Sequence, residues 1–367
     1  MTSRNTKLLN GSLVALVSMV VAFGAAELAS RALLPEVSDT FIVELDTVTN
    51  RFHHGVFPAL EPPRDEAYRI LFLGDSFTLG LGIPDRNADA FPAVTGRMFR
   101  SGSVDGLPAR DVQAFNLGMF SYSPSIYGAV LNRYAPLLRP HLVVIAVDDS
   151  DPQDDYMYAS MVEDDADGLP MSVYPKLPGV PSLLIPVARL SKFVRLSLFQ
   201  SHKFWHDVVL RRWRSEEDRY LGDIYFRYSH FKREDLHRWG SAFKRTLSVL
   251  DAMVRYCRRN QMDVLLVNYP YSAVVSGEIN TRWRTRFDLD PHRTYEPVFH
   301  RLQRNFAMRR RIGYYDLTYY VRQLPSLDGF YVEDGHFSEV GHQHLARELV
   351  RVIEQEFHPG GATRQSR

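Results

Sequence analysis

YRILFLGDSFTLG, residues 68–80, is the stretch of this sequence that decides its fold. The apolar run from Ile70 to Leu73 predicts a short buried strand, and Gly74-Asp75-Ser76 then predicts a tight turn. The Ser76 hydroxyl therefore falls at the carboxyl end of a strand, which is where open α/β sheets place their active sites. Serine is a weak nucleophile by itself, so a base, an orienting acid and oxyanion donors must come from elsewhere in the chain. The alternative is a plain turn in which Ser76 or Asp75 caps the next helix.

Four further apolar runs predict strands, and stretches with helical periodicity separate them. The runs span residues 111–115, 142–147, 263–268 and 313–316. The clearest helical stretch, residues 239–254, repeats apolar side chains at every third or fourth position. Strands that alternate with helices predict right-handed crossovers and an α/β fold with a parallel sheet. Five strands in the order 2-1-3-4-5 would be the flavodoxin-like arrangement, in which strands one and three end side by side, at Ser76 and Ser150.

Three later blocks accompany the Gly74-Asp75-Ser76 turn. Asn116-Leu117-Gly118 follows the second predicted strand, Asp148-Asp149-Ser150-Asp151 follows the third, and Glu333-Asp334-Gly335-His336 precedes the last predicted helix. In this order the four blocks resemble those of the SGNH hydrolases, also called the GDSL family. Each block is short, and it is their order over residues 69–356 that carries the resemblance.

The resemblance implies a three-layer α/β/α SGNH hydrolase fold and gives each block a role. Ser76 would be the nucleophile and His336 the base, with Asp334 orienting the imidazole ring. The backbone N–H groups of Ser76 and Gly118, together with Ser150, would hold the oxyanion. Glycine suits such a position because no Cβ blocks the approach of a ligand to the backbone. The alternative for Gly118 is that Asn-x-Gly is only a turn.

Two blocks depart from the family pattern. The third usually contains Gly-x-Asn-Asp with a donating asparagine, whereas this chain has Ser150, whose hydroxyl can donate one hydrogen bond but is shorter. The last usually has aspartate three residues before the histidine, whereas Asp334 lies two residues before His336 and Glu333 lies three before it. Some membrane-associated acetylating relatives use Asp-x-His, so Asp334 is predicted as the triad acid and Glu333 as the alternative.

The resemblance implies a Ser-His-Asp esterase that acts on a small-molecule or glycan ester, such as acyl or acetyl groups on a glycan. Two alternatives stay open, an O-acyltransferase that acetylates an extracytoplasmic polysaccharide and a non-catalytic glycan-binding or assembly protein on a decayed hydrolase fold. No cofactor and no metal are predicted. The aspartates of residues 148–155 are typical of calcium or magnesium ligands, but no glycine-centred loop closed by glutamate accompanies them. Helix caps and a solvated loop rim are the preferred interpretation.

Composition narrows the class of protein. The chain has 367 residues, 45% hydrophobic and 24% charged, which is typical of globular proteins. A net charge of +1 and the lack of a nucleic-acid-binding motif argue against a nucleic-acid partner. The single cysteine, Cys257, rules out an intramolecular disulfide and lies among apolar neighbours, so it is predicted to belong to the core.

The amino-terminal segment predicts a membrane anchor. Arg4 and Lys7 precede the uncharged stretch 13–26, which is typical of a signal peptide or a signal anchor. An uncleaved transmembrane helix within residues 1–35 is preferred over a cleaved signal peptide. Positive charge before the span puts the remainder outside the cytoplasm, so a single-pass protein with a periplasmic catalytic domain is predicted.

The remaining domain boundaries follow from changes in composition. Residues 36–67 are predicted as a linker, 68–357 as the hydrolase domain and 358–367 as a disordered tail. Within the domain, 156–235 matches nothing in the minimal hydrolase pattern and is predicted to be an insertion. Its basic amphipathic stretch 187–213 would either contact an anionic membrane surface or cover the rim of the active site.

Overall fold

The computed structural model describes residues 2–33, 61–104, 106–159, 162–173, 187, 191–194, 197 and 227–359. The chain divides into two units, one of Met1–Thr47 and Tyr174–Arg214 and the other of Val48–Val173 and Ser215–Arg367. Most of the predicted linker, most of the basic stretch 187–213 and residues 360–367 of the predicted tail lie outside the described residues. The predicted domain boundaries therefore stay a prediction.

A five-stranded parallel sheet forms the centre of the larger unit, with the order β2-β1-β3-β6-β7. Its strands are β1 (Tyr68–Leu73), β2 (Val112–Asn116), β3 (Leu142–Val147), β6 (Asp263–Asn268) and β7 (Gly313–Asp316). The order differs from the predicted 2-1-3-4-5 because two unpredicted strands, β4 (Val162–Asp164) and β5 (Pro170–Val173), come before β6 in the chain. They form a separate antiparallel pair, and the strands predicted as fourth and fifth are β6 and β7.

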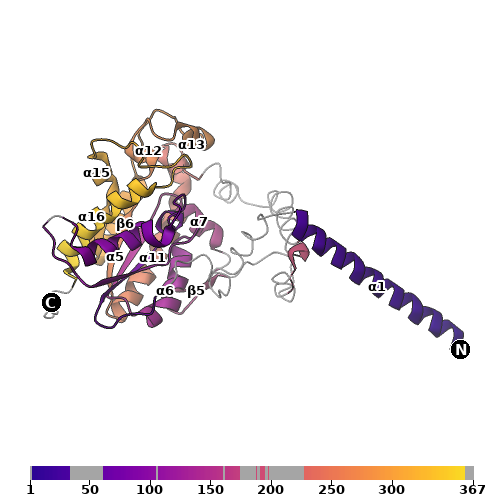
Figure 1. Cartoon of the computed structure of the whole chain (residues 1–367). Helices are drawn as coiled ribbons and strands as arrows, with labels where there is room; N and C mark the ends of the chain where they lie inside the picture. Colours follow the sequence, from indigo (N-terminus) through magenta and orange to yellow (C-terminus); the bar gives the residue numbers. More distant parts are fainter. Residues whose placement is uncertain are drawn as a thin grey trace. The chain divides into compact units, whose positions relative to one another are not determined.

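Helices cover both faces of the sheet. Because side chains alternate along a strand, Ile70 and Phe72 of β1 join one buried apolar cluster and Leu71 and Leu73 join another. The first cluster includes side chains of α5 and α16, which lie side by side (Figure 1), and the second includes side chains of α6, α11 and α14. Among the described residues of the larger unit, the helices are α3 (Ser76–Leu79), α4 (Arg86–Asp89), α5 (Phe91–Ser101), α6 (Pro124–Leu138), α7 (Asp151–Tyr158), α11 (Gly240–Arg259), α12 (Ser272–Val275), α13 (Thr281–Arg286), α14 (Val298–Arg310), α15 (Leu317–Arg322) and α16 (Glu339–Phe357), with 3₁₀ turns η5 (Ser229–Phe231) and η6 (Leu236–Trp239).

The smaller unit is organised around one long helix, α1 (Thr2–Leu33). Near its carboxyl end the Glu27 carboxylate accepts hydrogen bonds from Ser191 Oγ at 2.8 Å and from the N–H groups of Lys192 and Phe193 at 3.0 and 2.9 Å. Burial raises the pKa of Glu27, but these bonds and the one from Arg31 lower it to about 2. In the part of the chain that the structure describes, no helix is both long and apolar enough to cross a membrane, so the predicted transmembrane helix is not found.

Candidate active site

The turn after β1 places Ser76 at the start of α3. Asp75 caps this four-residue helix, because its Oδ1 accepts the N–H of Phe77 at 2.9 Å. Only glycine fits at position 74, where a Cβ would lie 1.9 Å from Oγ1 of Thr78. The predicted position of Ser76 at the strand's carboxyl end is confirmed, and the capping role considered as its alternative belongs to Asp75 in the same turn.

The structure brings Ser76, His336 and Asp334 into one hydrogen-bonded row. Ser76 Oγ lies 2.8 Å from His336 Nε2, and His336 Nδ1 lies 2.9 Å from Asp334 Oδ1. The backbone N–H of His336 donates to the same Oδ1 at 3.1 Å. The side chain of His336 is 18% exposed and that of Asp334 is 58% exposed, so water screens the carboxylate more than the imidazole. The arrangement is that of a nucleophile, a base and the acid that orients the base.

A tight turn explains how an acid only two residues from His336 can reach its ring. Gly335 has a φ of +95°, in the left-handed region that favours glycine. The turn is closed by the N–H of Val332, which donates to the carbonyl of His336 at 2.8 Å. The ring of Phe77 lies 4.7 Å from the imidazole between centroids, so helix α3 also packs against the base.

Glu333, the alternative acid, does not contact the imidazole. Its Oε1 lies 3.1 Å from Nη1 of Arg282, and the two side chains are 86% and 90% exposed. The structure therefore brings Asp334, and not Glu333, to His336.

Gly118 lies against the nucleophile's helix, but its N–H group already has an acceptor. That N–H donates to Asn116 Oδ1 at 2.9 Å, and Asn116 Nδ2 donates to the Thr78 carbonyl at 2.9 Å. A Cβ on Gly118 would come within 2.5 Å of the Leu79 nitrogen. Glycine is thus required by close backbone packing, whereas the predicted oxyanion donor is held by a side chain in this structure.

The hydroxyl of Ser150, which is also a predicted oxyanion donor, likewise has a hydrogen-bond acceptor within the protein. It donates to Asp148 Oδ1 at 2.8 Å, and the backbone N–H of Ser150 donates to the same oxygen at 2.7 Å. Because a hydroxyl carries a single proton, it has none left for an oxyanion while this bond persists. Ser150 lies at the N-cap position of α7 and its side chain is buried, but that side chain makes no capping hydrogen bond to the helix.

The acidic block after β3 forms a buried cluster with the acid of the nucleophile turn. Burial raises the pKa of Asp75 and Asp151 well above the ordinary value, and the charge of nearby Asp148 raises both further. Asp154 is paired with Arg227 at 2.5 Å. Within the described ranges, no three His, Cys, Asp or Glu side chains are grouped so as to hold a metal ion. The five aspartates of residues 148–155 are buried, so the interpretation as a solvated loop rim is wrong. Hydrogen bonds and ion pairs hold their carboxylates instead.

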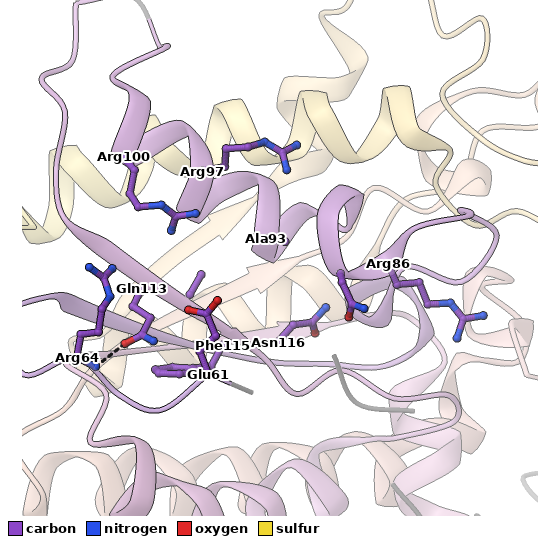
Figure 2. A pocket seen from close by; sticks show the side chains of 11 residues that line it. Glu61, Arg64, Arg86, Ala93, Arg97, Arg100, Gln113, Phe115 and Asn116 are labelled. Atoms are coloured by element: carbon purple, nitrogen blue, oxygen red, sulfur yellow. Dashed lines mark hydrogen bonds between the residues drawn. The ribbon is translucent and has the colours of Figure 1, made fainter. Parts of the chain in front are cut away.

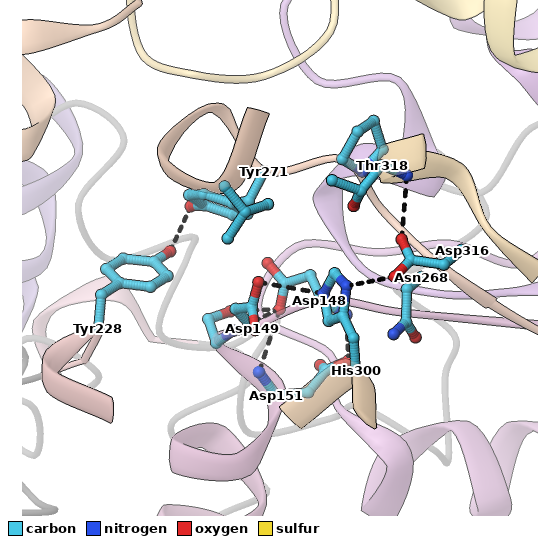
Figure 3. Close-up of polar contacts among 12 residues, drawn as sticks. Asp148, Asp149, Asp151, Tyr228, Asn268, Tyr271, His300, Asp316 and Thr318 are labelled. Atoms are coloured by element: carbon cyan, nitrogen blue, oxygen red, sulfur yellow. Dashed lines mark hydrogen bonds and ion pairs between the residues drawn. The ribbon is translucent and has the colours of Figure 1, made fainter. Parts of the chain in front are cut away.

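Sequence reasoning missed a buried histidine network beside this cluster (Figure 3). His300 Nδ1 lies 2.9 Å from Asp316 Oδ2, and His300 Nε2 lies 3.2 Å from Asp149 Oδ2, an ion-pair distance without hydrogen-bond alignment. Burial lowers the pKa of His300, but Asp149 and then Asp316 raise it to about 10. His230 lies 3.4 Å from the other oxygen of Asp149. The network joins α14 to the ends of β3 and β7, and no sequence motif marks it.

The sequence matches no protein-family model and no curated protein, but solved structures do match. A lipase/acylhydrolase from Enterococcus faecalis is 15% identical with a TM-score of 0.40, and the match covers 78% of this chain and 95% of that chain. A catalytic mutant of Axe2, an acetylxylan esterase from Geobacillus stearothermophilus, is 13% identical with a TM-score of 0.41, covering 80% and 96%. A protein named TesA is 13% identical with a TM-score of 0.42, covering 78% and 98%. These values are low, and they assign neither an activity nor a substrate to this chain.

Proposed function

We propose that the protein is a serine esterase of the SGNH type, acting on a small-molecule or glycan ester such as acyl or acetyl groups on a glycan. The observation that carries the proposal is the row in which Ser76 Oγ lies 2.8 Å from His336 Nε2 and His336 Nδ1 lies 2.9 Å from Asp334 Oδ1. Three residues with these functions, in this order of contact, are what nucleophilic acyl transfer requires.

In the proposed mechanism, Ser76 Oγ attacks the acyl carbon while His336 Nε2 takes the hydroxyl proton. Asp334 holds Nδ1 and stabilises the positive charge that the ring gains. When the ester bond breaks, the leaving alcohol oxygen receives the proton from His336, and the acyl group remains on Ser76. A water molecule activated by the same imidazole then releases the acid and restores the serine.

The negative charge that develops on the carbonyl oxygen needs N–H donors. No acceptor for the N–H of Ser76, at the first position of α3, is found among the described residues. The N–H of Ser121, an exposed residue with a φ of +54°, likewise has no acceptor among the described residues. Its loop is joined to the nucleophile turn by the N–H of Met119, which donates to the Gly74 carbonyl at 3.2 Å. We infer that the N–H of Ser76, which the sequence already predicts as an oxyanion donor, is joined by the N–H of Ser121 in place of Gly118 and Ser150.

Turnover of an activated acetyl ester and labelling by a fluorophosphonate probe test the proposal. We expect labelling on Ser76, and loss of both labelling and turnover in Ser76→Ala. Ser103→Ala, which alters an exposed serine, is the matched control and should behave as the parent chain. Undiminished labelling of Ser76→Ala would refute the mechanism.

One observation favours the second candidate, a non-catalytic glycan-binding protein. Two of the predicted oxyanion donors, the Gly118 N–H and the Ser150 hydroxyl, are held by protein side chains. A binding protein would retain affinity for glycans without releasing acetate. Incubation with an acetyl donor and glycan acceptors separates the remaining outcomes, because free acetate indicates hydrolysis and acetylated glycan indicates an O-acyltransferase.

Placement of the catalytic domain outside the cytoplasm stays a prediction from the charge pattern before residue 13. A reporter that is active only outside the cytoplasm, fused after Arg367, is expected to be active. If a reporter that is active only inside the cytoplasm is active when fused at the same position, that result would contradict this prediction.

A further inference from the structure

A cavity of about 610 Å³ lies along the edge strand β2, at one side of the sheet (Figure 2). Its lining comes from the segment before β1, from α4 and α5, and from β2 itself. The charged lining residues are four arginines and one glutamate, namely Arg64, Arg86, Arg97, Arg100 and Glu61. The volume is within the range of roughly 300–1,000 Å³ that is usual for small-ligand sites.

Carbonyl oxygens hold two of these guanidinium groups in place without removing their charge. Arg97 Nη1 donates to the Ala88 carbonyl at 2.7 Å, and Arg100 Nη1 donates to the Val112 carbonyl at 2.9 Å. A guanidinium group has five N–H donors, so most of the donors on each remain for a ligand. The nearest carboxylate to Arg97 is Asp89, at 3.6 Å and therefore weakly paired.

The other two arginines differ in whether a carboxylate pairs with them. Arg64 is neutralised by Asp111, whose two carboxylate oxygens lie 2.8 and 3.1 Å from its nitrogens. Arg86 lies over the ring of Phe120 at 5.7 Å, and no carboxylate pairs with it among the described residues. Glu61, the one carboxylate in the lining, makes no ion pair within the described part of the chain. Arg86 and Arg100 are therefore the lining arginines that no described carboxylate pairs with, whereas Arg97 shares Asp89 at 3.6 Å. With Glu61, Asp89 and Asp111 counted against the four arginines, the charge around the cavity is positive.

One lining residue connects this cavity to the candidate active site. Asn116 lines the cavity at the carboxyl end of β2. Its side chain also donates to the carbonyl of Thr78, two residues after Ser76, and accepts the N–H of Gly118. The wall of the cavity at Asn116 is thus hydrogen-bonded to α3, the helix that begins with Ser76.

We propose that this cavity binds an acidic sugar of the glycan whose ester is presented to Ser76. The negatively charged group would be a carboxylate, phosphate or sulfate, because the planar guanidinium fork of arginine matches such groups with two parallel hydrogen bonds. Glu61 would accept hydrogen bonds from sugar hydroxyl groups. The link to an ester substrate rests on the proposed esterase function, whereas the binding of an acidic sugar does not.

Binding is measured on the full chain carrying Ser76→Ala, so that no ester is consumed. The probes are an oligogalacturonide, a neutral xylo-oligosaccharide of equal length, and inorganic phosphate. We expect the acidic oligosaccharide to bind more tightly than the neutral one, and its binding to weaken as salt is raised. Replacing Arg97 and Arg100 together by Gln should raise Kd by about tenfold or more, since each loses a charge-assisted hydrogen bond.

The Lys version of the same double variant keeps the charge and should retain a larger part of the affinity. Arg301→Gln, on the exposed side of α14, is the matched control and should bind as the parent does. Equal affinity for acidic and neutral oligosaccharides, unchanged Kd in the Gln double variant, or binding of phosphate without binding of either oligosaccharide would overturn the inference. With Ser76 restored, the parent chain and Arg301→Gln should turn over a small acetyl ester equally. Absence of that turnover in the parent chain would count against the esterase proposal alone.

Discussion

Replacing His300 by glutamine should destabilise the protein strongly, although His300 lies outside the hydrogen-bonded row of Ser76, His336 and Asp334. Its side chain is 2% exposed and lies between Asp149 and Asp316, at 3.2 and 2.9 Å. The variant leaves two buried carboxylates without their shared cation. Removing one partner of a buried ion pair costs about 3–5 kcal/mol. For a domain of roughly 290 residues, with an unfolding entropy of about 2.1 cal/mol/K per residue, this corresponds to a fall in Tm of about 5–8 °C.

Thermal melts at several pH values test the magnitude and its cause. The pKa of His300 is raised from 6.5 to about 10 in the folded protein. The stabilisation is therefore complete below pH 6.5 and is lost as pH rises towards 10. The gap in Tm between the parent and His300→Gln should narrow over this range. His292→Gln, at an exposed histidine, is the control and should change stability by less than about 0.5 kcal/mol. A His300 variant that melts with the parent at pH 7, or a gap that does not change with pH, would refute the reasoning.

Four further substitutions test the candidate site. Ser150→Ala should cost about 1.5–3 kcal/mol of stability by removing a hydrogen bond to a carboxylate, and should leave kcat within about tenfold of the parent. A fall in kcat of about 10²–10³-fold would instead indicate an oxyanion donor. Asp334→Asn should lower kcat by up to about 10⁴-fold. Glu333→Gln should leave kcat nearly unchanged, because the exposed ion pair of Glu333 contributes little. The reverse result would make Glu333 the acid. Gly118→Ala should cost about 1–3 kcal/mol, measured by chemical denaturation, since its Cβ has no room. A Gly118→Ala variant as stable as the parent would contradict the prediction that a Cβ at this position has no room.

Periodicity and turn chemistry were sufficient to predict the five strands of the sheet and the position of Ser76, whereas His336 and Asp334 came from the family resemblance. The run 142–147 was predicted as a buried strand and is β3, buried throughout. The position of Ser76 followed from a strand ending in Gly-Asp-Ser, and the choice of Asp334 followed from the resemblance. The strand and the turn that carries Ser76 are local features, so a short stretch of sequence contains the information that specifies them.

Features that depend on distant partners could not be predicted. A histidine within a helix gives no sign that Asp149 and Asp316 converge on it, because their meeting depends on how β3, β7 and α14 pack. The Gly118 N–H was assigned to the oxyanion by the family resemblance. Nothing in the sequence indicates that Asn116 Oδ1 accepts this N–H, because the Asn116 side chain is held by the Thr78 carbonyl of α3. The β4–β5 pair was missed because β4, Val162–Asp164, is short and mostly polar.

The proposed nucleophile and the proposed base lie far apart in the sequence, and this has a consequence for biosynthesis. Ser76 and His336 are 260 residues apart, and at about 5–20 residues per second a ribosome needs roughly 13–52 s to travel between them. For that interval the nascent polypeptide carries the proposed nucleophile without the base that activates it. Chains that terminate before Asp334 would retain all five strands of the sheet yet be inert towards esters. Enzymatic activity would therefore appear only after His336 has been translated.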